Sequence, residues 1–306
     1  MEIGRYKVDR IKRIEPSLGA TFVGKRDALL VARETDDGYE LEVIQLKGFK
    51  SVGRAPVEGV VAVTRVGEEA VLLKARPERG KTANRDERRM EVRSLKDFHV
   101  SASFVEDRPG YVAAHPDGTQ IAVAHDFGPL HIWDTGTGEM LSKYGSKGIG
   151  GVAYSHDGSL LAAKEFAGAL KIFDAGKLAQ PLRSVAVGGE AQITFHPDKP
   201  VVAAAAKNAI KIVDASTAEV TLSIKTTKKE SQGAIGHMAY SPDGTLLATA
   251  ILNGGVVSFW DMDKAKFIGH MLELDTPLSG VEFDAEGKFL LVASYEAAEI
   301  YTIVSA

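Results

Sequence analysis

The sequence contains no cysteine in its 306 residues, and this absence excludes several classes of site. Disulfide bonds, cysteine-ligated zinc and iron–sulfur clusters all need thiol groups, so none of them is expected. The chain also lacks an apolar run near the ~18 residues that a membrane span needs. Its N-terminal segment is charged from Glu2 onward and has no apolar signal-peptide core. These absences predict a soluble, cytoplasmic protein with no membrane partner.

An excess of charge of one sign is missing as well. The formal net charge is −4, with 25% charged and 44% hydrophobic residues, which is ordinary globular composition. Nucleic acid is therefore an improbable partner by charge alone. No stretch shows a sustained helical period, whereas short runs of Val, Ile, Ala and Leu end at turns that contain Gly, Asp or Pro. Such runs predict an all-β protein.

A four-residue turn motif recurs through the last two thirds of the chain. In its Ser-Pro-Asp-Gly form, proline fixes φ and glycine accepts positive φ, which suits a tight turn between strands. The fourth positions of successive copies are 40, 41, 45 and 43 residues apart. The copies are HPDG at 115–118, SHDG at 155–158, HPDK at 196–199, SPDG at 241–244 and DAEG at 284–287.

A second motif, a short strand that ends in aspartate, keeps the same spacing. Its copies are LHIWD ending at Asp134, LKIFD at Asp174, IKIVD at Asp214 and VSFWD at Asp261, with a degenerate EIYTI at 299–303. Each unit of about 40–45 residues reads as four short strands, which resembles the WD40 repeat of β-propeller proteins. The resemblance is clear over residues 110–306. We predict that the four aligned aspartates cap turns.

The resemblance implies a propeller, and the strand pattern extends it toward the N-terminus. Residues 19–55 and 59–104 form two degenerate units, so that seven units are expected in all. The last unit ends after its third strand, and the segment Arg5–Ile14 offers the missing strand. Closure by that strand would pair the edge that an open row of strands exposes. We therefore predict one domain over 1–306, a seven-bladed propeller with residues 1–14 as its closing strand.

Members of the WD40 family often hold a buried His, Ser/Thr, Asp and Trp network in each blade. This chain has only Trp133 and Trp260, and the family's Gly-His phrase is represented by Gly236-His237. The blades are therefore expected to depend on apolar packing. The candidates for the missing aspartate, Asp126 and Asn253, stand near the turn before the third strand.

Motifs for catalysis or metal binding are also lacking. The eight histidines form no His-x-x-x-His or similar tight spacing, and His115 and His196 each open a turn motif. No nucleophile elbow or phosphate-binding loop occurs. The inner strands are small and apolar, with Glu282 as the one obvious acid. We expect no catalytic, cofactor-binding or metal-ligating residue, and no cofactor or small-molecule substrate.

A partner surface is the remaining interpretation. The resemblance implies docking on the face that carries the loops between second and third strands, where aromatic residues supply binding energy. We therefore predict a scaffold or regulatory subunit for a protein or peptide partner. Two alternatives stay open, namely a propeller hydrolase or lyase with a channel metal, and a nucleic-acid-associated module that uses an arginine-rich loop at 76–89. The candidate contact residues are Asp126, Phe127, Phe166, Asn253, Tyr295, Arg76, Arg79, Arg85, Arg88 and Arg89.

Overall fold

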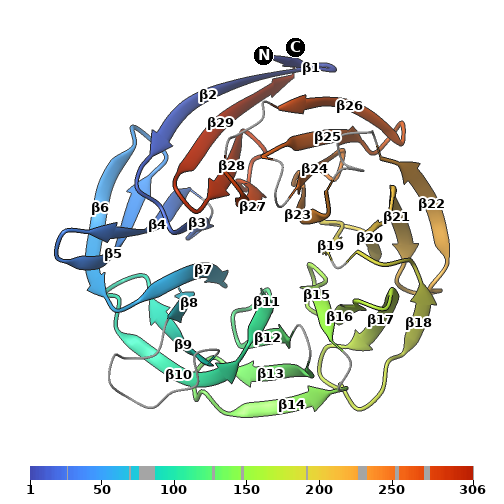
Figure 1. Ribbon diagram of the computed structural model, residues 1–306, viewed down its shortest axis with the longest axis horizontal. Coiled ribbons are helices and arrows are strands. Elements are labelled where there is room, and N and C mark those ends of the chain that lie inside the picture. The colour runs from blue at the N-terminus through green and yellow to red at the C-terminus, as the bar shows by residue number, and fades with distance from the viewer. Residues whose placement is uncertain are drawn as a thin grey trace.

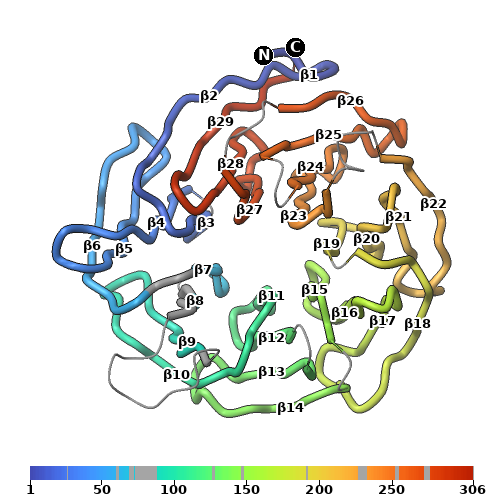
Figure 2. The backbone as a smooth tube through the Cα atoms, in the orientation of Figure 1, coloured from blue at the N-terminus to red at the C-terminus, as the bar shows by residue number. Residues whose placement is uncertain are grey.

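In the residues that the computed structural model describes, strands make up all the regular structure, and they are arranged around a common centre (Figures 1 and 2). The structure describes residues 1–25, 27–68, 70–75, 87–125, 128–145, 148–190, 192–226, 233–251, 255–271 and 276–305. Within these ranges, no helix is long and apolar enough to cross a membrane. The all-β prediction is therefore confirmed, and so is the propeller architecture.

Six units of the sequence each form a four-stranded antiparallel sheet whose consecutive strands are neighbours. The first two correspond to the degenerate units and are called blades 1 and 2. Blade 1 contains β3 (Gly19–Val23), β4 (Ala28–Thr35), β5 (Gly38–Gln45) and β6 (Lys50–Val57). Blade 2 contains β7 (Val60–Val66), β8 (Ala70–Ala75), β9 (Glu87–Ser94) and β10 (Val100–Asp107).

The next four sheets follow the clearer repeats. Blade 3 contains β11 (Pro109–Ala114), β12 (Gln120–His125), β13 (Leu130–Asp134) and β14 (Met140–Tyr144). Blade 4 contains β15 (Ile149–Tyr154), β16 (Leu160–Glu165), β17 (Ala169–Asp174) and β18 (Arg183–Ala186). Blade 5 contains β19 (Ile193–Phe195), β20 (Val201–Ala206), β21 (Ala209–Asp214) and β22 (Val220–Lys225). Blade 6 contains β23 (Ile235–Tyr240), β24 (Leu246–Ile251), β25 (Val257–Asp261) and β26 (Lys266–Met271).

The remaining sheet joins both ends of the chain and is called the closing sheet. Its strands, from the inside outward, are β27 (Leu278–Phe283), β28 (Phe289–Ser294), β29 (Ala298–Ser305), β2 (Tyr6–Ile14) and β1 (Glu2–Ile3). The last unit thus supplies only three strands, and β2 pairs with β29 from Tyr6 opposite Ser305 to Ile14 opposite Ala298. The predicted closing strand is confirmed. The prediction of seven blades is wrong. Six sheets are four-stranded blades, whereas the remaining sheet has five strands and combines strands from both ends of the chain.

The hydrophobic core lies between neighbouring sheets. A sheet inside the ring is covered on both faces, so second strands such as β20 are apolar without alternation, as in buried strands generally. In β24 all six residues are buried, and Trp260 on the adjacent β25 is fully buried. Trp260 belongs to a cluster with Leu247 from its own blade and Ala203 and Ile210 from blade 5. Packing of this kind repeats around the ring.

The turn motifs connect blades as well as strands. The His115 ring in blade 3 packs edge-on against Tyr154 in blade 4, with 5.1 Å between ring centroids, and its Nε2 lies 3.0 Å from the Gly158 carbonyl oxygen. A Cβ atom on Gly158, whose φ is +73°, would stand 2.4 Å from that nitrogen. His196 packs against Gly244 of blade 6 in the same way. Each glycine therefore meets two needs, a positive φ and the close approach of a neighbouring turn.

The strand-end aspartates cap turns, as predicted. The Oδ1 atom of Asp134 accepts hydrogen bonds from the backbone N–H groups of Gly136 at 2.9 Å and Thr137 at 2.7 Å. Equivalent bonds to following backbone N–H groups are made by Asp174, Asp214 and Asp261. These carboxylates are Asx turn caps and do not form a functional ring.

Candidate functional site

The loop face, defined as the face that carries the connections between second and third strands, presents exposed aromatic side chains. Phe166 follows β16 in blade 4 and is 44% exposed. Its backbone N–H donates to the Gly148 carbonyl oxygen at 3.2 Å. The carbonyl oxygen of Gly168, in the same loop, accepts bonds from the backbone N–H groups of Val187 and Gly188. Phe166 therefore projects from a loop that is held by the segments entering and leaving its blade.

Tyr295 occupies the corresponding loop of the closing sheet and is 61% exposed. The hydroxyl oxygen of Ser294 accepts from the backbone N–H groups of Glu296 and Ala297, and the Glu296 carbonyl oxygen accepts from Ser17 at 2.9 Å. This loop is therefore braced as well. Blade 4 and the closing sheet lie on opposite sides of the ring, so Phe166 and Tyr295 belong to separate patches of one face (Figure 1).

Most of the other predicted contact residues lie outside the described residues, namely Asp126, Phe127, Asn253, Arg76, Arg79 and Arg85. Arg88 and Arg89 are described, and their assignment to a loop is wrong. Both belong to β9, where they pair in register with Glu106 and Val105 of β10. The Arg89 side chain lies 2.7 Å from the Glu91 carboxylate. Strand β9 therefore begins at Glu87, and its pairing with β10 includes both arginines.

This correction leads to a prediction for the arginine-rich segment 76–89, in which the expected result depends on how many residues are replaced. Replacing residues 77–86 by a short Gly/Ser linker is expected to shift the melting temperature by no more than about 2–4 °C, because loop closure depends only weakly on length. Extending the replacement through Arg88 removes two ladder positions of β9 and is expected to lower it further. Thermal melts of the two variants measure the difference. A collapse of the shorter replacement would show that this segment is part of the packed structure.

The central cavity has a volume of about 790 Å³ and is bordered by inner strands and turns from several sheets. Its lining includes Tyr154, Phe195, Tyr240 and the one predicted acid, Glu282. The carboxylate of Glu282 accepts hydrogen bonds from the Thr21 hydroxyl at 2.9 Å and from the Phe22 backbone N–H at 3.2 Å. Glu282 therefore connects the closing sheet to blade 1, which is a structural role.

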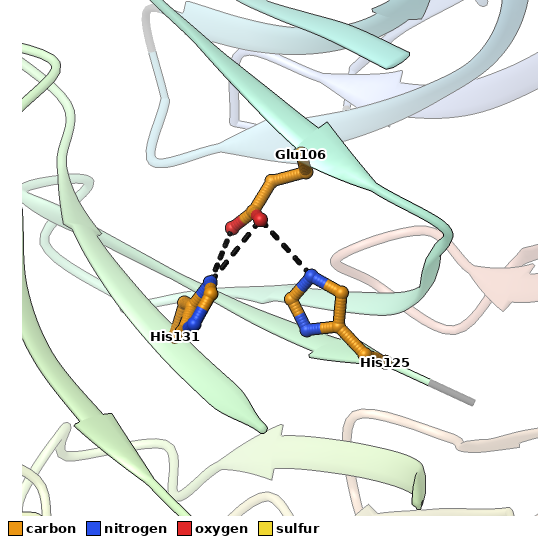
Figure 3. Close-up of side chains that lie close together, drawn as sticks. All are labelled: Glu106, His125 and His131. Atoms are coloured by element: carbon orange, nitrogen blue, oxygen red, sulfur yellow. Dashed lines mark hydrogen bonds and ion pairs between the residues drawn. The ribbon is translucent and has the colours of Figure 1, made fainter. Parts of the chain in front are cut away.

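A buried polar cluster that the sequence motifs did not reveal lies between blades 2 and 3 (Figure 3). Glu106, near the end of β10, faces His125 on β12 and His131 on β13. One Glu106 oxygen, Oε2, lies 3.0 Å from His125 Nε2, and the other, Oε1, lies 2.9 Å from His131 Nδ1. Trp133 donates its indole N–H to Oε1 at 2.5 Å. We call Glu106, His125 and His131 the interblade cluster.

Electrostatics within the interblade cluster favour charged groups. Glu106 and His125 are each 4% exposed, so burial alone would raise the pKa of Glu106. Hydrogen bonds and charge from His125 and His131 outweigh burial and lower that pKa to about 2. For His125, burial alone would lower the pKa, but the Glu106 carboxylate raises it above its usual value.

The expectation that the blades depend on apolar packing is therefore incomplete. Trp260 in blade 6 does keep one element of the family network, a hydrogen bond from its indole N–H to the Thr249 hydroxyl at 3.0 Å. The equivalent Trp133 instead donates to a carboxylate from the preceding blade. A six-residue His–His spacing and a glutamate 19 residues upstream match no short motif. The cluster becomes visible only when two blades are packed together.

Comparisons with known proteins agree with the repeat architecture. The family model described as "WD domain, G-beta repeat" matches residues 223–261, which run from β22 to the end of β25. A similar protein is pre-mRNA-processing factor 19 of Oryza sativa subsp. japonica, with 31% identity over 121 residues. That alignment covers 38% of this chain and 21% of the rice protein, so the chain spans about a fifth of its relative. Fold, repeat spacing and these matches together show that the chain is similar to proteins of the WD40-repeat family.

Proposed function

We propose that this protein is a non-enzymatic scaffold or regulatory subunit that binds a protein or peptide partner through the loop face around Phe166. The observation that carries the proposal is an exposed aromatic ring on a hydrogen-bonded loop. Aromatic side chains dominate binding hot spots, and a loop that is already ordered loses little conformational freedom on binding. Phe166 meets both conditions, since it is 44% exposed and its loop is fixed at Gly148, Val187 and Gly188.

The charged group next to the Phe166 ring is paired within the protein, which favours an apolar contact from the partner. The neighbouring Glu165 is buried, and its carboxylate lies 2.6 Å from Lys171 Nζ. That ammonium group also donates to the Tyr144 hydroxyl at 3.0 Å. Glu165 is thereby neutralised within the protein. The partner is consequently expected to present an apolar side chain to Phe166.

Substitution of the aromatic residues tests this proposal. The partner is first captured by affinity purification from native extract and identified by mass spectrometry, and its affinity is then measured by calorimetry. Phe127→Ala combined with Phe166→Ala is expected to weaken binding by about 30-fold, or ~2 kcal/mol, without unfolding the protein. Leu141→Ala is the matched control, because Leu141 is 50% exposed on the outer strand β14, away from the loop face. Unchanged affinity of the double variant would rule out this surface.

The two other function classes predict different results. A nucleic-acid module would bind DNA or RNA with an affinity that falls steeply with salt and depends on the arginines of 76–89. A channel enzyme would need convergent polar groups, whereas Glu282 is already engaged by Thr21 and Phe22. The cytoplasmic location stays a prediction from the sequence.

A further inference from the structure

The interblade cluster contains an arrangement of lone pairs that requires a cation. His125 Nδ1 lies 2.6 Å from the Pro129 carbonyl oxygen, which can only accept, so Nδ1 carries a proton. In the neutral ring, Nε2 then presents a lone pair. That lone pair faces the Glu106 carboxylate at 3.0 Å, and the carboxylate also has only lone pairs to offer. Either a second proton or a metal ion must lie between them.

The donor set is that of a transition-metal site. Two imidazole nitrogens and one carboxylate are the protein ligands of many open, three-ligand zinc sites. The ligand atoms of Glu106, His125 and His131 all lie within 4.8 Å of one another. Tetrahedral bonds of about 2.0–2.1 Å would place neighbouring ligand atoms about 3.3 Å apart. The separations of 2.9 and 3.0 Å between Glu106 and the two histidines need only a small expansion to admit the ion.

The surrounding groups also have the arrangement found around metal ligands. Ligating histidines usually donate their other ring N–H to a carbonyl or carboxylate, and ligating carboxylates are themselves hydrogen-bonded. Here the Pro129 carbonyl oxygen accepts from His125 Nδ1, and the Trp133 indole donates to Glu106 Oε1. Both hydrogen bonds hold the ligand side chains in the orientation seen here.

We propose that Glu106, His125 and His131 form a binding site for a divalent transition-metal ion of the zinc class. The ion would connect the outer strand of blade 2, through Glu106, to the second and third strands of blade 3, through the two histidines. It would crosslink blades 2 and 3 and thereby stabilise the ring. An ion that binds the folded protein raises its apparent stability according to its concentration relative to Kd.

Zinc titration of the full chain tests the site. Protein treated with a chelator and dialysed is titrated with ZnCl₂ by calorimetry at neutral pH, and its melting temperature is followed in parallel. We expect one Zn²⁺ per chain and a melting temperature that rises with zinc concentration. His131→Gln is expected to weaken binding by at least about 100-fold, because loss of an outer-shell partner alone costs 10–100-fold.

The control variant is His99→Gln. His99 also faces a carboxylate, with Nδ1 2.6 Å from Asp97 Oδ1, but both side chains are more than half exposed. It should bind zinc as the unmodified protein does. If His131→Gln does not fold in chelator, Co²⁺ replaces Zn²⁺ in the unmodified protein, where a visible absorption band that zinc abolishes supports the site. No stoichiometric uptake, or equal affinity of folded His131→Gln, overturns the proposal and assigns a proton to the cluster.

Discussion

Deleting residues 1–14 is expected to lower the melting temperature by more than about 10 °C or to cause aggregation. The deletion removes β2 from the β29 ladder and takes three buried side chains, Ile3, Val8 and Ile14, out of the core. Each such side chain contributes about 1.5–3 kcal/mol. Their combined loss approaches the whole stability of a typical domain. It also exposes β29 as an unpaired edge, which promotes association between chains.

The deletion also removes two ion pairs between β2 and β29. Glu299 on β29 is 1% exposed, and its carboxylate lies 2.7 Å from Arg10 and 2.5 Å from Arg13, both on β2. Removal of these two partners takes both ion pairs from that carboxylate. Because the deletion also opens this edge to water, the added loss is smaller than the cost of an unpaired charge that stays buried.

Thermal melts of the deleted protein, with and without a synthetic peptide of residues 1–14, measure this effect. Strand addition by the peptide should restore much of the lost stability. Lys7→Ala, an exposed change on β2, serves as the control and should melt like the unmodified protein. Melting of the deleted protein within a few degrees of the full chain would contradict closure by β2.

Glu106→Ala, measured in chelator, is expected to reduce the free energy of unfolding by about 3–5 kcal/mol. The carboxylate is the common acceptor for His125, His131 and Trp133, all contributed by the next blade. Its removal leaves several donors in a buried space without an acceptor. Each buried donor that loses its acceptor costs about 1–3 kcal/mol.

The matched comparison is Thr249→Ala, which removes the acceptor from the other tryptophan, Trp260. That bond is a single neutral one, so its loss should cost only about 1–2 kcal/mol. Urea unfolding of both variants gives the two free energies under identical conditions. Equal losses would show that the carboxylate adds nothing beyond a hydrogen bond to tryptophan.

Local chemistry explains why so much of the fold could be predicted. A turn such as Ser241–Gly244 depends on neighbours in sequence, since the backbone N–H of Gly244 donates to the Ser241 carbonyl oxygen at 2.9 Å and Asp243 caps the N–H of Thr245 at 3.0 Å. The aspartate at the end of each third strand acts just as locally. The turn motif and the strand-end aspartate both recur at one spacing. This regularity made it possible to predict the strands between them, the order of those strands and the strand that closes the ring.

The candidate site residues were predicted less well, because exposure and pairing are decided by distant segments. That Phe166 and Tyr295 lie in loops followed from the repeat, but only the packed structure shows both rings exposed and both loops braced by other segments. Arg88 looked like part of a charged loop, yet strand pairing with β10 draws it into β9. Charge composition does not specify where a β-ladder ends.

By itself, the sequence determined a repeated four-stranded unit, an all-β propeller and a chain whose first strand completes its last sheet, because hydrophobic patterning and turn chemistry act over a few residues. Only the tertiary structure decided which polar side chains meet between blades. Glu106 and His131 are 25 residues apart and belong to different sheets, and neither has a motif that requires the other. The contact between them depends on how blade 2 packs against blade 3. That packing is set by the shape of both sheets, so no single stretch of sequence predicts it.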